Sequence, residues 1–159
     1  ASLTGHLVLS TIHTNSAIGA IARLRDMGIE SYLLSSSIRV VIAQRLVRRL
    51  CEDCKTPIKP SATIQKEFQL EKNENIYQAV GCANCNNTGF KGRIALAECI
   101  NISDKLKALI HDEASEAKLA ESAFKENLSL DLSSSQLLRD GLTSYEELLR
   151  VQNHQDANL

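Results

Sequence analysis

Four cysteines, arranged as two C-x-x-C pairs, are the residues of this chain whose spacing most clearly suggests chemistry. The first pair is Cys51 and Cys54, and the second is Cys82 and Cys85. Two such pairs are the usual ligand set of a closed tetrahedral zinc site, because each short turn directs both of its sulfurs to one ion. The spacer, residues 55–81, is longer than the roughly 15–20 residues of the common zinc-ribbon pattern. The sequence therefore predicts a structural zinc whose second pair returns after a long excursion.

Other uses of these cysteines are less consistent with the pattern. A disulfide framework would require an oxidising compartment, and a thioredoxin-like redox motif uses one C-x-x-C rather than two. A catalytic zinc is disfavoured because four thiolates leave no open position for water. The four histidines are also not at ligand spacing to either pair; they are His6, His13, His111 and His154. The fifth cysteine, Cys99, lies in a largely apolar run and is interpreted as a core thiol.

Composition limits the classes of function. The 159 residues are 43% hydrophobic and 23% charged, which is typical of a globular protein. No apolar run approaches the about 18 residues of a membrane-spanning helix, so none is expected. The net charge of −1 and the aromatic content of 4% argue against a nucleic-acid-binding protein.

The part of the chain before the cysteines shows an α/β pattern. Residues 7–12 form a short apolar run that predicts a buried strand. A helix over 17–27 should follow, capped by Asn15 or Ser16 and ended by Gly28 in a left-handed conformation. A second helix is predicted to start at Ser31 and to include apolar positions as far as residue 42.

Strands are predicted on both sides of the cysteine region, and helices after it. The strands cover 44–50 and 93–100, with a polar helix near 64–70 between them. Ser103 and Ser115 should cap helices that reach residues 110 and 124. Two capping-box patterns, at 133–136 and 143–146, predict two further helix starts.

Several segments, in register along nearly the whole chain, resemble the traffic ATPases of the secretion superfamily. The similar segments are residues 3–17 (LTGHLVLSTIHTNSA), 23–30 (RLRDMGIE), 43–54 (AQRLVRRLCEDC), 81–93 (GCANCNNTGFKGR) and 140–151 (DGLTSYEELLRV). The first resembles the histidine box of that superfamily. The sequence of residues 23–30 most resembles the type II secretion ATPases (GspE). The type IV pilus assembly ATPases (PilB) carry almost the same signatures.

The resemblance implies a fold and a cellular role. The fold would be α/β, the C-terminal part of a RecA-like P-loop ATPase domain with an inserted tetracysteine zinc subdomain and a helical C-terminal tail. Residues 1–50 would belong to the ATPase core, 51–92 to the zinc subdomain, and 93–159 to a returning strand and the helical region. The parent would be a cytoplasmic homo-hexamer that uses ATP and Mg²⁺ and works at the inner membrane through platform proteins of the secretion or pilus machine.

The phosphate-binding loop of such ATPases is not present in this sequence. A P-loop requires G-x-x-x-x-G-K-[ST], and the chain contains no Gly-Lys dipeptide. In the family the phosphate loop and the Walker B acidic residue precede the histidine box. We therefore expect this chain to be the C-terminal portion of the motor, and not to hydrolyse ATP alone.

The resemblance also assigns roles to individual residues. His13 would lie near the terminal phosphate of the nucleotide in the intact motor, where an imidazole can donate a hydrogen bond as charge develops, and His6 would support it. Arg23 and Arg45 are candidate nucleotide-binding residues, because arginine binds phosphate bidentately. For Arg45, and for Arg48 and Arg49 beside it, a contact with a neighbouring subunit and a solvated strand face remain alternatives. Arg23 is open to the same alternatives, a subunit contact or a solvated surface.

A function of another class is a free-standing zinc-binding module that docks a membrane-platform protein or a regulator without nucleotide. The histidine box argues against it, because that motif has a role only beside a phosphate loop. Under the first hypothesis, a portion of a secretion or pilus ATPase, the zinc would stabilise the long excursion, and its removal should unfold residues 51–92 selectively.

Overall fold

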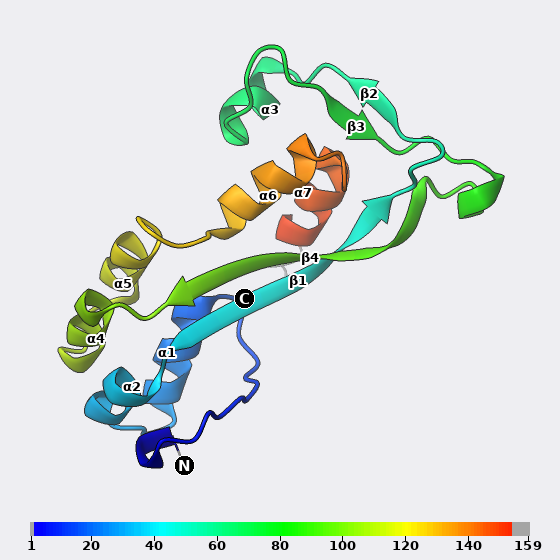
Figure 1. The fold of residues 1–159 in the computed structure, drawn as a ribbon. Helices are drawn as coiled ribbons and strands as arrows, with labels where there is room; N and C mark the ends of the chain where they lie inside the picture. The colour runs from blue at the N-terminus through cyan, green and yellow to red at the C-terminus, as the bar shows by residue number, and fades with distance from the viewer. Residues whose placement is uncertain (1, 154–159) are drawn as a thin grey trace. The chain divides into compact units, whose positions relative to one another are not determined.

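The structure, a computed structural model, describes residues 2–153 and contains helices and strands in a mixed order (Figure 1). Contacts divide the chain into two compact units, residues 1–43 with 98–129 and residues 44–97 with 130–159. The predicted α/β class is confirmed. Along the chain the elements are η1 (Ser2–Thr4), α1 (Ala17–Asp26), α2 (Ser31–Ser37), β1 (Val40–Leu50), β2 (Thr56–Ile58), α3 (Ala62–Glu67), β3 (Ile76–Gln78), η2 (Ala83–Cys85), β4 (Phe90–Asn101), α4 (Asp104–His111), α5 (Glu116–Ala123), α6 (Leu130–Arg139) and α7 (Tyr145–Asn153).

The first unit is built from α1, α2, α4 and α5 around one apolar core. Its fully buried side chains include Ile21, Ile100, Ile110 and Leu119. The helices begin where serines can accept backbone hydrogen bonds: Ser16, Ser103 and Ser115 each accept an amide of the first turn, as predicted. Gly28 has φ +83°, so the predicted left-handed end of α1 is also confirmed.

A buried carboxylate supports the start of α1. Glu98 of β4 is 3% exposed, and its Oε1 accepts a hydrogen bond from the backbone amide of Ala17, the first residue of α1. A negative group is favoured there, because the amides at a helix N-terminus are unpaired and carry partial positive charge. Glu98 therefore joins β4 to the start of α1, the helix that follows the loop containing His6 and His13.

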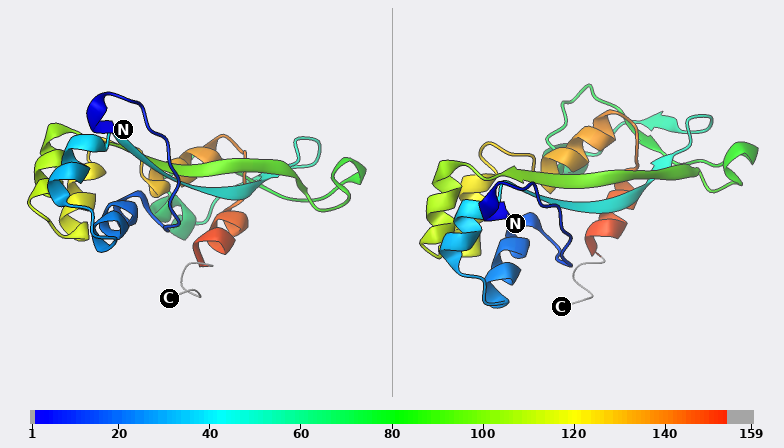
Figure 2. Two further views of the ribbon diagram at one scale, coloured as in Figure 1. Left: turned by 90° about the horizontal axis from the view of Figure 1, so that it is seen from below. Right: turned by 60° about the horizontal axis from the view of Figure 1, so that its bottom comes forward.

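Two predictions about this unit are wrong. Residues 7–12 are not a strand: Leu7 and Leu9 are 85% and 88% exposed, and the segment runs as a loop between η1 and α1 (Figure 2). A strand requires a partner, and the two sheets among residues 2–153 pair β1 with β4 and β2 with β3. The helix from Ser31 ends at Ser37 instead of continuing to 42, because the β-branched run that follows forms β1.

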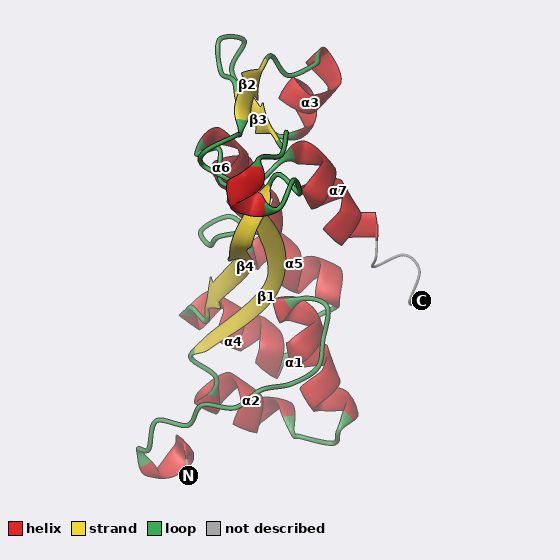
Figure 3. Cartoon of the chain, turned by 90° about the vertical axis from the view of Figure 1, so that its right-hand side faces the viewer, coloured by secondary structure: helices red, strands yellow, loops and turns green. Residues whose placement is uncertain are grey.

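The second unit combines β-structure with α3, α6 and α7 (Figure 3). β2 and β3 pair antiparallel, with Thr56 opposite Gln78 and Ile58 opposite Ile76. The core of the unit contains Val47, Phe68, Ile76, Leu96, Leu138 and Leu148. The ring of Phe68 meets Tyr145 edge-on at 5.8 Å between centroids, so the excursion between the cysteine pairs is anchored on α7.

The turn between α6 and α7 is fitted closely to the same excursion. Gly141 has φ +62°, and a Cβ there would lie 2.5 Å from the ring of Tyr77, so only glycine fits. Its carbonyl accepts a hydrogen bond of 3.0 Å from Lys55 Nζ.

The capping box predicted at 133–136 is wrong, because α6 already begins at Leu130. The box at 143–146 is displaced by one residue: the Ser144 hydroxyl accepts the Glu147 amide at 3.3 Å.

Glu147 is the buried charge of the second unit. Its side chain is 0% exposed and accepts hydrogen bonds from Arg48 Nη2 at 2.6 Å, the Arg48 backbone amide at 2.9 Å and Arg150 Nη2 at 2.7 Å. Burial alone would raise the pKa of this carboxyl, but the hydrogen bonds from Arg150 and Arg48 lower it to about 2. The guanidinium of Arg48 also lies 4.1 Å from the ring centroid of Phe90. Glu147 therefore fixes α7 to β1.

None of the helices among residues 2–153 has the length and apolar character needed to cross a membrane.

We predict that Glu147→Gln lowers the free energy of unfolding at pH 7 by about 3 kcal/mol, because it removes the buried negative charge that two half-exposed guanidinium groups contact. The pKa of Glu147 is depressed from 4.5 to about 2, so its stabilisation is complete above pH 4.5 and is lost as the pH falls toward 2. Urea unfolding at several pH values should therefore show that the difference in unfolding free energy between the wild-type chain and Glu147→Gln becomes smaller as the pH falls from 4.5 toward 2. The exposed neighbour Glu146→Gln is the matched control, and equal stability of the two variants at pH 7 would contradict the prediction.

Candidate metal centre

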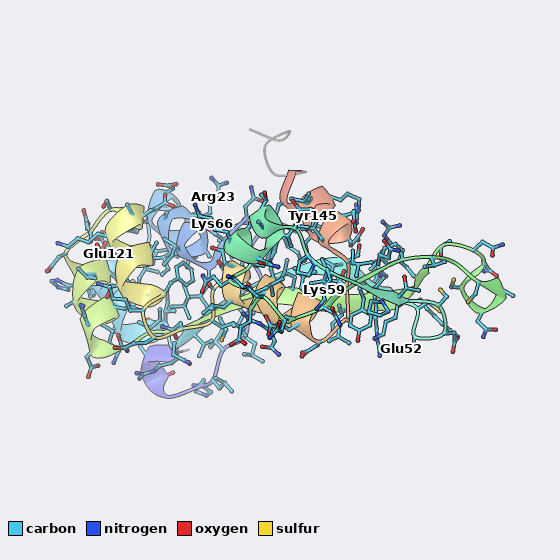
Figure 4. All side chains as sticks on the ribbon, turned by 90° about the horizontal axis from the view of Figure 1, so that it is seen from above. Arg23, Glu52, Lys59, Lys66, Glu121 and Tyr145 are labelled. Atoms are coloured by element: carbon cyan, nitrogen blue, oxygen red, sulfur yellow. The ribbon has the colours of Figure 1, made fainter. Side chains whose placement is uncertain are left out.

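The four predicted metal ligands come together in the second unit. Cys51 directly follows β1, Cys54 ends the first turn, and Cys82 and Cys85 flank and end the short helix η2. Their four sulfur atoms all lie within 4.8 Å of one another. Figure 4 draws the side chains as sticks, with sulfur in yellow, and labels Glu52 of the first turn. Within the part of the chain that the structure describes, this is the one group of His, Cys, Asp and Glu side chains spaced to hold a metal ion.

The distances between the sulfurs fit a tetrahedral ion. Sγ of Cys51 lies 3.9 Å from Sγ of Cys82, and Sγ of Cys85 lies 3.8 Å from those of Cys54 and Cys82. Thiolates bind zinc at about 2.3 Å, which places neighbouring sulfurs of a tetrahedron roughly 3.8 Å apart. A disulfide would instead require about 2.05 Å. The cluster therefore has the dimensions of a tetrathiolate metal site.

Backbone amides point at the sulfurs. The Gly81 amide donates to Sγ of Cys54 at 3.3 Å, and the amides of Cys82 and Gly89 donate to Sγ of Cys85 at 3.2 Å each. Such donors stabilise negative charge on sulfur. Burial would raise the pKa of Cys85, but the Cys82 and Gly89 amides lower it to about 6, which favours the thiolate that binds a metal.

The sequence of the second turn explains this geometry. Asn86 and Asn87 both have positive φ, at 53° and 59°, a conformation that asparagine tolerates better than most residues. At Gly81 (φ +113°) a Cβ would lie 2.7 Å from the Asn87 carbonyl oxygen. At Gly89 (φ +75°) a Cβ would lie 2.6 Å from Cβ of Ala79. The glycines thus allow the chain to close around Cys85 with its amides facing inward.

The first turn is of the same kind but differs electrostatically. The amides of Cys54 and Lys55 both donate to the Cys51 carbonyl, at 3.3 and 3.0 Å. The amide of Asp53 lowers the pKa of Cys51, but burial and the neighbouring cysteines raise it to about 11. Burial also raises the pKa of Cys54. A metal ion at this site would therefore displace protons from the first pair, so its affinity would depend on pH.

The structure places the candidate histidines in the first unit. His6 and His13 are exposed and lie in the segment between η1 and α1, outside any helix or strand. His6 Nδ1 lies 3.1 Å from Thr4 Oγ1. Neither histidine belongs to the metal-ligand group found among residues 2–153. Their proposed roles toward nucleotide therefore stay predictions.

The candidate arginines have varied surroundings. Arg23 is exposed on α1 (Figure 4), and Arg45 is partly buried on β1. Beside Arg45, Arg48 pairs with Glu147 and Arg49 with Glu52 at 3.1 Å. Two members of the predicted basic cluster thus have local acidic partners.

The structure identifies three carboxylates whose contacts the sequence did not reveal. These are Glu98 at the start of α1, Glu147 between β1 and α7, and Asp53, which accepts a hydrogen bond from Asn84 of the other cysteine turn. Only the position of Glu147 in a first helical turn could be predicted, and its burial could not. Cys99 is half-buried, and its backbone pairs with Leu128.

The chain is similar to secretion proteins over almost its whole length. Residues 1–150 match the model of the family described as Type II/IV secretion system protein. Over 95% of the chain it is 47% identical to the type II secretion system ATPase E of Vibrio cholerae, and 44% identical to the type II secretion system protein E of Pseudomonas aeruginosa. It is 42% identical, over 94% of the chain, to the type IV pilus assembly ATPase PilB of Myxococcus xanthus.

These matches cover 30% of the length of each of the two type II proteins and 27% of PilB. The chain thus spans about a third of the length of the curated relatives that it matches. Because the family model covers nearly every described residue, this chain belongs to the Type II/IV secretion system protein family.

Proposed function

We propose that this chain is the C-terminal portion of a cytoplasmic ATPase that powers type II protein secretion by driving pseudopilus assembly. The observation that carries the proposal is the similarity to type II secretion proteins in register over 95% of the chain, at up to 47% identity. Type IV pilus assembly is the second candidate, because PilB is nearly as similar at 42% identity.

The tetracysteine cluster would hold a structural zinc ion. Four sulfurs fill a tetrahedral shell and leave no position for a reacting water, so the ion would supply folding energy rather than catalysis. The ligands would be Cys51, Cys54, Cys82 and Cys85, which close the excursion over residues 55–81. The thiol chemistry of the set and the spacing near 3.8 Å support zinc.

In the proposed domain division, residues 1–50 complete a RecA-like ATPase core, 51–92 form the zinc subdomain, and 93–159 form the returning strand and helical region, of which 154–159 lie outside the described residues. ATP and Mg²⁺ would bind the parent protein. His13 would act near the terminal phosphate with His6 in support, and Arg23 and Arg45 would contact nucleotide. The exposure of both histidines leaves their rings accessible to such a ligand.

The proposed partners follow from the same family. The parent would assemble as a homo-hexamer and act at the bacterial inner membrane through platform proteins of the secretion machine. The chain's net charge of −1 gives no reason to add nucleic acid to these partners.

A chimera tests the proposal. In it, this chain replaces the matched 153 residues of the Vibrio cholerae ATPase. We expect the chimera to hydrolyse ATP and to restore secretion in a strain that lacks the native protein. His13→Ala should lower its ATP turnover at least tenfold, because a hydrogen-bond donor to developing charge is lost.

The control is His111→Ala, which removes an exposed histidine whose ring lies beside Asp112 and should leave turnover unchanged. A folded chimera that hydrolyses ATP but restores pilus assembly in a PilB-deficient strain and not secretion would favour the second candidate. Equal turnover of the His13→Ala and His111→Ala chimeras would contradict the role of His13.

A further inference from the structure

Two polar residues link the cysteine turns outside the sulfur cluster. Asp53 and Asn84 each occupy the position before the second cysteine of their turn. The side-chain amide of Asn84 donates a hydrogen bond of 3.1 Å to Oδ2 of Asp53. It is a side-chain contact between the two turns that involves no sulfur atom.

Asp53 also contacts the sulfur cluster directly. Its Oδ2 lies 3.8 Å from Sγ of Cys51, and its backbone amide forms a hydrogen bond that favours the Cys51 thiolate. A carboxylate this close to a thiolate repels it. The side-chain amide of Asn84 partly offsets the charge of the carboxylate, since it donates a hydrogen bond to the same oxygen.

We propose that the Asp53–Asn84 hydrogen bond is a clamp that holds the two cysteine turns in register and thereby raises the affinity of the site for its metal ion. The inference rests on the proposed zinc site and adds two positioning residues to it.

The length of the excursion gives the clamp its physical effect. The two turns are separated by residues 55–81, so ordering both of them around an ion costs chain entropy. A contact that already joins the turns reduces the part of this cost that metal binding must offset. Residues that orient metal ligands without touching the metal commonly change affinity in this way. Because both side chains are exposed, the effect should be modest.

The experiment is a double-mutant cycle on the zinc dissociation constant of the full chain, measured by competition with a chromophoric chelator. Asn84→Ala should weaken zinc binding roughly three- to tenfold, the range expected for one hydrogen bond. Asp53→Ala loses the same bond but also removes the carboxylate that repels the Cys51 thiolate, so it should weaken zinc binding less than Asn84→Ala does. The double variant should be no weaker than the weaker single variant, because both changes remove the same contact. Asp53→Asn should retain most of the affinity, since its side-chain carbonyl can still accept from Asn84.

Two controls distinguish the loss of the hydrogen bond from the loss of a negative charge and from a disrupted fold. Glu52→Ala removes a carboxylate from the same turn, but Glu52 pairs with Arg49 and Lys55, so zinc affinity should not weaken. With cobalt at saturation, all variants should show the spectrum of a tetrahedral tetrathiolate, which a disrupted fold would not give.

Three results would overturn the clamp. Unchanged affinity in Asn84→Ala would do so, and so would additive losses in the double variant. If the wild-type chain bound no zinc, the zinc assignment itself would fail and the clamp with it. If the wild-type chain bound zinc tightly and Asn84→Ala bound it equally tightly, only the clamp would be contradicted, and the zinc site would stand.

Discussion

The second unit depends on one constraint: a chain that leaves the sulfur cluster at Cys54 must return to it at Cys82. The excursion between them has two three-residue strands and one short helix, too little to form a core of its own. It is held by contacts at its ends and by a few apolar anchors, among them Phe68 and Ile76. At the closing end, the Cys51 amide donates to the Gly89 carbonyl at 2.9 Å. A metal ion bound to the four sulfurs would hold the two cysteine turns together and so fix both ends of the excursion.

Buried charges fix elements within each of the two units. Glu147 is fully buried and holds Arg48 and Arg150, while Glu98 accepts the first amide of α1 in the other unit. In both cases hydrogen-bond donors of the protein take the place of water around the carboxylate. Burial of the carboxylate is therefore favourable only when these donors are correctly positioned. In the cysteine turns, backbone amides perform the same task for sulfur. Charges that are buried with their partners therefore specify where strands, helices and turns meet.

The sequence predicts what depends on local spacing and misses what depends on distant partners. The cysteine pairs and the caps at Ser16, Ser103 and Ser115 were predictable, because each motif acts within a few residues. Residues 7–12 have the composition of a strand, but no local signal shows whether a partner strand is present. The burial of Glu147 depends on Arg48, far away in sequence, and the Asp53–Asn84 contact depends on the return of the excursion.

The most direct test of this account is hydrogen exchange of the purified chain, measured by mass spectrometry, with zinc bound and after its removal by a chelator. The account predicts one zinc per chain, and a loss of amide protection over residues 51–92 when the metal is removed, while α1, α2, α4 and α5 stay protected. A chain that carries no metal, or one whose protection over 51–92 is the same with and without zinc, would contradict the central role of the four sulfurs.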